Sequence, residues 1–207
     1  MDDVAFDHAL IKAAFALAAE RGWHHVSVAA AAQAAELPLS RARQRFPTRH
    51  MILLRFERLA DQAALTEATL EGSARDRLFG LLMRRIDTLQ SHRAGVLAIR
   101  GSLTVRPRTA LWLALATRHS MRWMLEGSGI RTDGLRGELR VKGLLAVWLW
   151  TIRAWRTDQT EHLDVTMTAL DKALSRAEQM ADFLGWRNHP AGPPSGASPD
   201  PPLDPAT

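Results

Sequence analysis

Apolar residues recur at three- and four-residue steps along most of this chain of 207 residues, and that spacing marks one face of an α-helix. The first such stretch covers residues 6–21 and stops at Gly22, a residue type that often follows the last turn of a helix. Later stretches of the same kind cover residues 49–70, 73–90, 92–102, 107–126, 135–157 and 158–184. The pattern predicts an all-α protein, because the period-two alternation typical of strands is absent.

Two short helices joined by a break lie between the first two long ones. Residues 27–35 are rich in alanine and begin with Ser27, whose hydroxyl can accept a hydrogen bond from a backbone N–H of the first turn. Pro38 ends this pattern, since proline disfavours the helical conformation in the residue before it. Residues 39–46 then form the second short helix. This arrangement is typical of a helix-turn-helix.

The second short helix has an apolar side and a polar side. Leu39, Ala42 and Phe46 share one side at helical spacing and are expected to face the core. The outward side and its flanks carry polar and basic residues without an acidic one: Ser40, Arg41, Arg43, Gln44 and Arg45. Arginine pairs with phosphate or a guanine edge and glutamine with adenine, so the helix suits a DNA major groove. A solvated basic face on an ordinary helical protein is the alternative.

Charge and cysteine content narrow the classes of partner. The 27 basic residues exceed the 22 acidic ones, and the net charge of +5 favours an anionic partner such as nucleic acid or a membrane surface. Cysteine is absent, which excludes disulfides and thiolate metal sites, and we expect neither a metal nor a cofactor. No apolar run reaches membrane-spanning length, so stable membrane insertion is not expected. Asp2 and Asp3 replace the basic start of a signal peptide, and a cytoplasmic location is the expectation.

The N-terminal part of the chain carries a set of short motifs. They include Glu20-Arg21-Gly22-Trp23, Val26-Ser27-Val28, Ala34-Ala35, and Phe46-Pro47-Thr48-Arg49 followed by Leu53-Leu54. As a set, these motifs resemble the N-terminal domain of TetR-type transcriptional regulators. The resemblance implies that the helix-turn-helix binds double-stranded DNA.

The same resemblance implies a TetR-like fold in parts. Residues 1–70 are expected to form the three-helix DNA-binding domain with a connecting helix, and residues 71–187 a helical bundle for ligand binding and dimerisation. Homodimer contacts are expected through residues 135–157 and 158–184. Residues 188–207 are mostly proline, glycine, serine, alanine and aspartate, and we expect a disordered tail because they cannot bury enough apolar surface.

The resemblance also implies which residues contact DNA. They are Ser27, Leu39, Ser40, Arg41, Arg43, Gln44, Arg45, Arg49 and His50. The sequence departs from the family at Pro38, which replaces a hydroxyl residue that caps the recognition helix. Arg43 stands where the family usually has a phosphate-contacting tyrosine, and Arg49 where it usually has lysine. Both arginines can still contact phosphate.

The second half of the chain is rich in tryptophan, and a pocket between its helices is expected to hold a small apolar molecule or a lipid. The expected lining residues are Trp112, His119, Trp123, Trp148, Ile152 and Trp155. In TetR-type proteins the C-terminal helices form such a pocket. Simple core packing is the alternative, because aromatic residues at helical spacing usually pack.

A second resemblance covers the stretch from Ser120 to Asp171. Ser120-Met121-Arg122-Trp123, Thr132-Asp133 and Lys142-Gly143 make it similar to the TetR-fold lipid-binding accessory proteins of ubiquinone biosynthesis, whose studied members have lost DNA binding. This implies an alternative function as a lipid-binding accessory protein. That family reaches the membrane through a C-terminal amphipathic helix, which the proline-rich tail of this chain cannot form.

An enzyme is the third class of function. The sequence shows no pattern of a Ser-His-Asp catalytic triad, no metal-ligand spacing and no paired carboxylates in apolar surroundings. We therefore expect no catalytic residue.

Overall fold

The computed structural model describes residues 1–66, 68–69, 71–103 and 107–185. Within these ranges the regular structure is helical and no strand occurs, so the predicted all-α class is confirmed. The tail predicted over residues 188–207 lies outside the described residues. No helix in the described ranges has the length and apolar character needed to cross a membrane.

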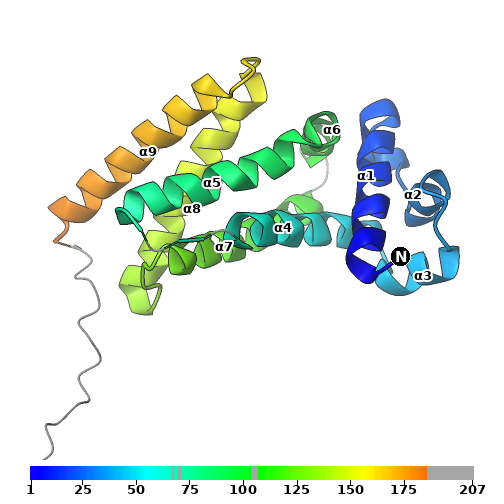
Figure 1. Cartoon of the computed structure of the whole chain (residues 1–207), viewed down its shortest axis with the longest axis horizontal. Coiled ribbons are helices and arrows are strands. Elements are labelled where there is room, and N and C mark those ends of the chain that lie inside the picture. The colour runs from blue at the N-terminus through cyan, green and yellow to red at the C-terminus, as the bar shows by residue number, and fades with distance from the viewer. Residues whose placement is uncertain (67, 70, 104–106, 186–207) are drawn as a thin grey trace, which may run out of the picture.

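The N-terminal helices form a separate group at one end of the molecule (Figure 1). This group contains α1 (Asp3–Arg21), α2 (Val28–Ala34) and α3 (Leu39–Arg45). Helix α1 ends as predicted at Gly22, which adopts a φ of +80° that favours glycine. Trp23 follows in a short 3₁₀ turn and is buried, which closes the small core of this group.

Helix α4 (Arg49–Thr66) leads from this group into the larger part of the chain (Figure 1). It packs against α1 at one end and against α5 and α7 along its length. The helix predicted to reach residue 70 ends at Thr66. Because α4 belongs to both packed groups, it is the element through which they are joined.

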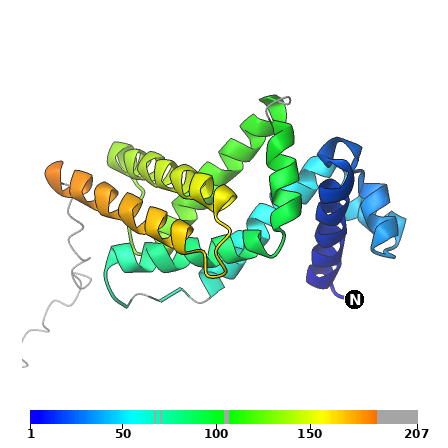
Figure 2. The same ribbon diagram turned by 90° about the horizontal axis from the view of Figure 1, so that it is seen from above.

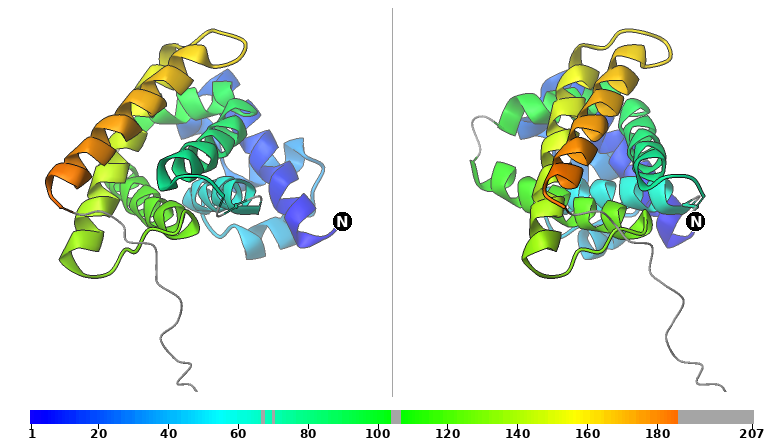
Figure 3. Two further views of the ribbon diagram at one scale, coloured as in Figure 1. Left: turned by 60° about the vertical axis from the view of Figure 1, so that its left-hand side comes forward. Right: turned by 90° about the vertical axis from the view of Figure 1, so that its left-hand side faces the viewer.

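The larger group is a bundle built from the remaining helices. These are α5 (Ala74–Gln90), α6 (Arg93–Leu103), α7 (Pro107–Gly127), α8 (Gly134–Thr157) and α9 (Asp164–Phe183). Ser73 and Asp76 form a reciprocal capping box at the start of α5. Helices α8 and α9 lie side by side at the far end of the bundle from α1 (Figures 2 and 3).

The start of the last helix differs from the prediction. The sequence pattern placed a helix over residues 158–184, but α9 begins at Asp164. The Asp158 carboxylate accepts hydrogen bonds from the backbone N–H of Thr160 at 3.0 Å and of Thr166 at 2.8 Å, and also from both threonine hydroxyls. Asp158 therefore organises a loop and the first turn of α9, because these bonds hold the chain in a turn before the helix starts.

Helix α6 packs closely against α1. A Cβ atom added to Gly95 of α6 would lie 2.6 Å from both Cβ and the carbonyl oxygen of Phe15. Only glycine allows this approach, because real Cβ atoms do not come within that distance of backbone atoms. The bundle is thus attached to the N-terminal group directly through α6 as well as through α4.

Candidate nucleic-acid interface and internal cavity

The turn between α2 and α3 sets the position of the candidate recognition helix. The Ser27 hydroxyl accepts a hydrogen bond from the backbone N–H of Ala30 at 3.0 Å, which confirms the predicted cap of α2. After α2 the chain reverses at Glu36, whose φ is +53°. Pro38 then precedes α3 and makes no side-chain cap, as predicted. Helix α3 therefore starts with its first N–H groups uncapped by a side chain.

The predicted apolar side of α3 is correct at two of its three positions. Ala42 and Phe46 are buried, but Leu39 is 49% exposed and does not face the core. Leu37, in the turn before the helix, is buried in its place. The small core takes its apolar side chain from the turn, so the first residue of α3 is left on the surface.

Arg41 does not project away from the domain as the helical wheel predicted. Its Nη2 lies 2.5 Å from an Asp3 carboxylate oxygen, and its guanidinium is 4.6 Å from the centre of the Phe6 ring. The hydrogen bond from Arg41 lowers the pKa of Asp3. The acidic partner comes from α1 and not from α3, so the composition of α3 alone did not reveal it.

Asp7 of α1 is the centre of a second set of ion pairs. This buried carboxylate accepts from Nε of Arg45 at 2.7 Å and from Nη2 of Arg45 at 2.9 Å, and it also pairs with Arg55 of α4. The hydrogen bonds with Asp7 raise the pKa of Arg45. Arg55 also donates to the backbone carbonyl of Arg45 at 3.1 Å. These contacts fasten α3 to α1 and α4.

The polar side chains left exposed on α3 are Ser40, Arg43 and Gln44. They lie within one helical turn and a half, beside the exposed Leu39, and present a cation, an amide and a hydroxyl together. At the start of α4, Arg49 donates to the backbone carbonyl of His24 at 3.1 Å, and His50 is exposed. The exposed Ser40, Arg43 and Gln44, with the half-exposed Arg49 beside them, have side chains of the kind that bind phosphates and base edges.

A buried polar cluster links α4 to the bundle. Arg85 of α5 is 1% exposed and donates to Glu57 at 2.5 Å and to Asp61 at 2.8 Å, both on α4. Ser120 of α7 donates to Asp61 at 2.6 Å. The Arg85 guanidinium also lies 4.5 Å from the centre of the Trp148 ring. Sequence reasoning missed this cluster, although an arginine within the apolar stripe of α5 is the signal that marks it.

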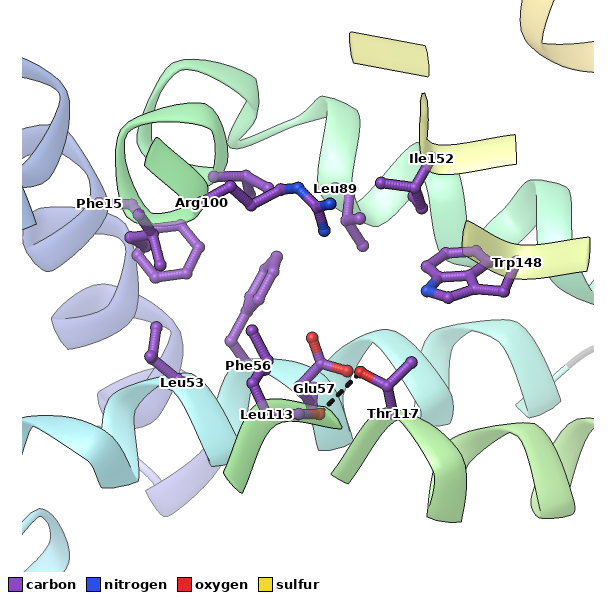
Figure 4. Close-up of a pocket in the computed structure, with 12 residues that line it drawn as sticks. Phe15, Leu53, Phe56, Glu57, Leu89, Arg100, Leu113, Thr117, Trp148 and Ile152 are labelled. Carbon is purple, nitrogen blue, oxygen red and sulfur yellow. Dashed lines mark hydrogen bonds between the residues drawn. The ribbon is translucent and has the colours of Figure 1, made fainter. Parts of the chain in front are cut away.

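A cavity of about 60 Å³ lies where the N-terminal group meets the bundle (Figure 4). Its walls come from α1, α4, α5, α6, α7 and α8: Phe15, Leu53, Phe56, Glu57, Leu89, Val96, Ile99, Arg100, Leu113, Thr117, Trp148 and Ile152. The walls are mostly apolar, with Glu57, Arg100 and Thr117 as the polar members. The cavity is partly open to solvent.

The structure brings only part of the predicted pocket together. Trp148 and Ile152 line the cavity. Trp155 is buried, and its indole N–H donates to Gln90 at 2.8 Å, so it packs in the core. The other three residues lie on α7 away from this cavity: Trp112 is 61% exposed, Trp123 is 49% exposed, and His119 is exposed and accepts from the Trp123 indole.

Three consecutive residues of α4 connect the interface to the cavity. Arg55 pairs with Asp7 of α1. Phe56 lines the cavity and meets Phe15 edge-on, with ring centres 4.6 Å apart. Glu57 lines the cavity and pairs with Arg85. One turn of α4 therefore contacts Asp7, which holds α3 in place, and also the cavity and the buried polar cluster.

Solved structures of TetR-family regulators have a similar fold. A TetR transcriptional regulator from Nitrosomonas europaea aligns with a TM-score of 0.71 at 21% identity, over 84% of this chain and 99% of that chain. One from Rhodococcus sp. RHA1 aligns with a TM-score of 0.57 at 18% identity, over 85% of this chain and 97% of that chain. One from Streptomyces coelicolor aligns with a TM-score of 0.60 at 20% identity, over 89% of this chain and 87% of that chain.

These alignments confirm the predicted TetR-like fold. No family model and no curated protein sequence matches the chain. The likeness is therefore one of fold, carried by the arrangement of the helices.

Proposed function

We propose that this protein is a transcriptional regulator of the TetR type, which binds operator DNA as a homodimer and responds to a small ligand in the cavity beside α4. The observation that carries the proposal is the exposed set of Ser40, Arg43 and Gln44 on the second helix of a helix-turn-helix. The ion pairs of Arg41 and Arg45 with α1 hold that helix in a fixed orientation. The TetR-like fold supports the same function.

The exposed side chains of α3 suit contacts with both backbone and bases. Arg43 can pair with a phosphate or with a guanine edge, and Gln44 can pair with adenine. Arg49 at the start of α4 is a further cation near the same end of the molecule. Arg41 and Arg45 serve as anchors in this proposal, because their guanidinium groups already have carboxylate partners.

Dimerisation through α8 and α9 is supported by the apolar surface of α8. Leu139, Gly143, Ala146 and Trp150 recur at steps of three and four residues and are all exposed. On α9, Val165 and Met180 are 50% and 59% exposed. A second copy that covers these faces removes them from water, and it places two recognition helices to bind successive major grooves.

Regulation by a ligand is supported by the position of the cavity. Phe15 of α1 and Leu53 and Phe56 of α4 form its walls on the side of the N-terminal group. A ligand that changes the packing of these side chains also acts on the helices that hold α3. A coupling free energy of about 1–3 kcal/mol is typical of allosteric proteins and is enough for regulation.

The alternative is a lipid-binding accessory protein without DNA binding. The exposed Trp112 and Trp123 on α7 favour an apolar partner of some kind. The cavity of about 60 Å³ does not favour a long isoprenoid chain, which needs a much larger space. The regulator is therefore the better supported of the two functions.

The test is a selection of genomic DNA fragments by the purified full-length protein at about 50 mM and 200 mM salt. We expect a palindromic motif that survives the higher salt, because two symmetric subunits read two half-sites. Arg43→Ala with Gln44→Ala should weaken binding to that motif by at least about tenfold. The exposed Arg58 of α4 lies outside the interface, so Arg58→Ala is the matched control and should bind normally.

Binding that is uniform across sequences and disappears at the higher salt would contradict the proposal, since it reflects phosphate attraction alone. In that case the lipid-binding alternative is tested by identifying isoprenoids or phospholipids that copurify with the protein.

A further inference from the structure

Arg100 of α6 points its guanidinium into the cavity, above Phe56 (Figure 4). Its Nε is buried and has no hydrogen-bond partner. Within the described residues, Arg100 also forms no ion pair, whereas Arg85 pairs with the two carboxylates of Glu57 and Asp61. Arg100 is half-buried, so its guanidinium has given up part of its water and gained no carboxylate partner in return, which is unfavourable.

The charged residues near Arg100 do not neutralise its positive charge. Glu57 lines the same cavity, but its carboxylate already accepts a hydrogen bond from Arg85 at 2.5 Å. Arg156 of α8 repels Arg100. Burial and this repulsion lower the pKa of Arg100, and the attraction of Glu57 offsets them only in part. The end of the cavity next to Arg100 therefore favours an anion.

The rest of the cavity favours an apolar body. Apart from Glu57, Arg100 and Thr117, its lining residues have aliphatic or aromatic side chains. The Thr117 hydroxyl donates to the backbone carbonyl of Leu113 at 2.9 Å, so its proton is already used. Phe15 and Phe56 supply aromatic surface on the side of the N-terminal group.

We infer that this cavity binds a small apolar monocarboxylate, whose carboxylate pairs with the Arg100 guanidinium and whose hydrocarbon part packs against Phe56 and Trp148. Arginine and carboxylate form paired hydrogen bonds of matching geometry, which identifies the charged group of the ligand. The free space of about 60 Å³ is small and opens to solvent, so the hydrocarbon part is one ring or a short branched chain that can extend through the opening. The assignment of this ligand as a regulator rests on the proposed function, but its binding does not.

The test compares benzoate with its uncharged analogue benzamide by isothermal titration calorimetry on the full-length protein without DNA. We expect the wild-type protein to bind benzoate at least about tenfold more tightly than benzamide, since a hydrogen bond to a charged group contributes that much. Arg100→Met should remove this preference while leaving benzamide binding unchanged. Arg58→Met, which removes an exposed cation from α4, should keep it.

If the wild-type protein binds benzoate and benzamide equally, or binds neither, the inference is wrong. This comparison needs only the wild-type protein, so it remains decisive even if Arg100→Met does not fold. An Arg100→Met protein that still prefers benzoate would overturn it as well. Retention of DNA fragments is measured separately with and without benzoate. If the protein binds benzoate but no specific DNA, the ligand assignment is supported and the proposed function is contradicted.

Discussion

Asp7 on α1 accepts two hydrogen bonds from Arg45 on α3, from Nε at 2.7 Å and from Nη2 at 2.9 Å. The same carboxylate pairs with Arg55 on α4, and the Arg55 guanidinium lies 4.9 Å from the centre of the Phe46 ring. Helix α3 has seven residues, and Ala42 is its buried member. Its orientation therefore depends on these ion pairs, because so short a helix buries little apolar surface of its own.

Replacing Asp7 with asparagine should destabilise the N-terminal group. Two arginines that are 18% and 27% exposed lose their shared carboxylate, and partial exposure to water softens the loss. We expect the free energy of unfolding to fall by about 1–3 kcal/mol. Denaturant titration measures it, with Glu20→Gln as the control, since Glu20 is exposed on the same helix. Equal stability of the wild-type and Asp7→Asn proteins would show that α3 does not depend on this carboxylate.

The loop before α9 should give the protein a specific sensitivity to acid. Burial alone would raise the pKa of Asp158, but hydrogen bonds from Thr160 and Thr166 outweigh it and lower the pKa to about 2. The usual pKa of an aspartate in an unfolded chain is about 4. Since the folded state holds the charged form more strongly, this contribution is complete above about pH 4 and is lost as the pH falls toward 2.

The measurement for this prediction is the stability of Asp158→Asn against the wild-type protein at several pH values. The variant should be less stable by about 1–2 kcal/mol at neutral pH, because it loses charged hydrogen bonds at the start of α9. The difference should narrow below pH 4 as the wild-type carboxylate is protonated. A difference that stays constant down to pH 2 would mean that the charge of Asp158 has no part in it.

Gly95→Ala should separate α6 from α1. The added Cβ would lie 2.6 Å from the Phe15 carbonyl oxygen, so one helix must move, and we expect a loss of about 1–3 kcal/mol. Gly101→Ala is a control on the same helix, since no atom of the described residues outside its own stretch of helix backbone lies within 4 Å of the added Cβ. Alanine there should be neutral or raise stability by up to about 1 kcal/mol through its helix propensity. Thermal unfolding compares the two, and a similar effect at both sites would refute close packing at Gly95.

Most of the helices could be predicted because each carries its own local signal. Gly22 ends α1, Ser27 caps α2, and the Ser73–Asp76 pair starts α5, and the structure agrees at each place. The prediction of where α9 begins was wrong because the pattern of apolar residues continues through residues 158–163. What interrupts the helix there is the carboxylate of Asp158, whose partners at Thr160 and Thr166 become evident only once the turn is formed.

The errors in the candidate sites have a common cause. A helical wheel places Arg41 opposite Ala42 and Phe46, but it does not show that Asp3 and Phe6 of another helix lie beside it. In the same way, periodicity identified tryptophans without showing which of them face inward. Trp148 lines the cavity, whereas Trp112 is exposed on the surface. The packing of α7 and α8 against other helices determines which face of each helix is buried, and the periodicity of a single helix does not show this packing.

The adjacent placement of Arg55, Phe56 and Glu57 on α4 has a thermodynamic consequence. Any displacement of this turn changes the contacts with Asp7 and with the cavity together, because the three residues belong to one rigid helix. Under the proposed function, a ligand that weakens DNA binding by a given factor must itself be bound less tightly by the DNA-bound protein, by the same factor. The operator then acts as a competitor of the ligand without occupying its site, and the number of operators in a cell helps to set the ligand concentration at which regulation begins.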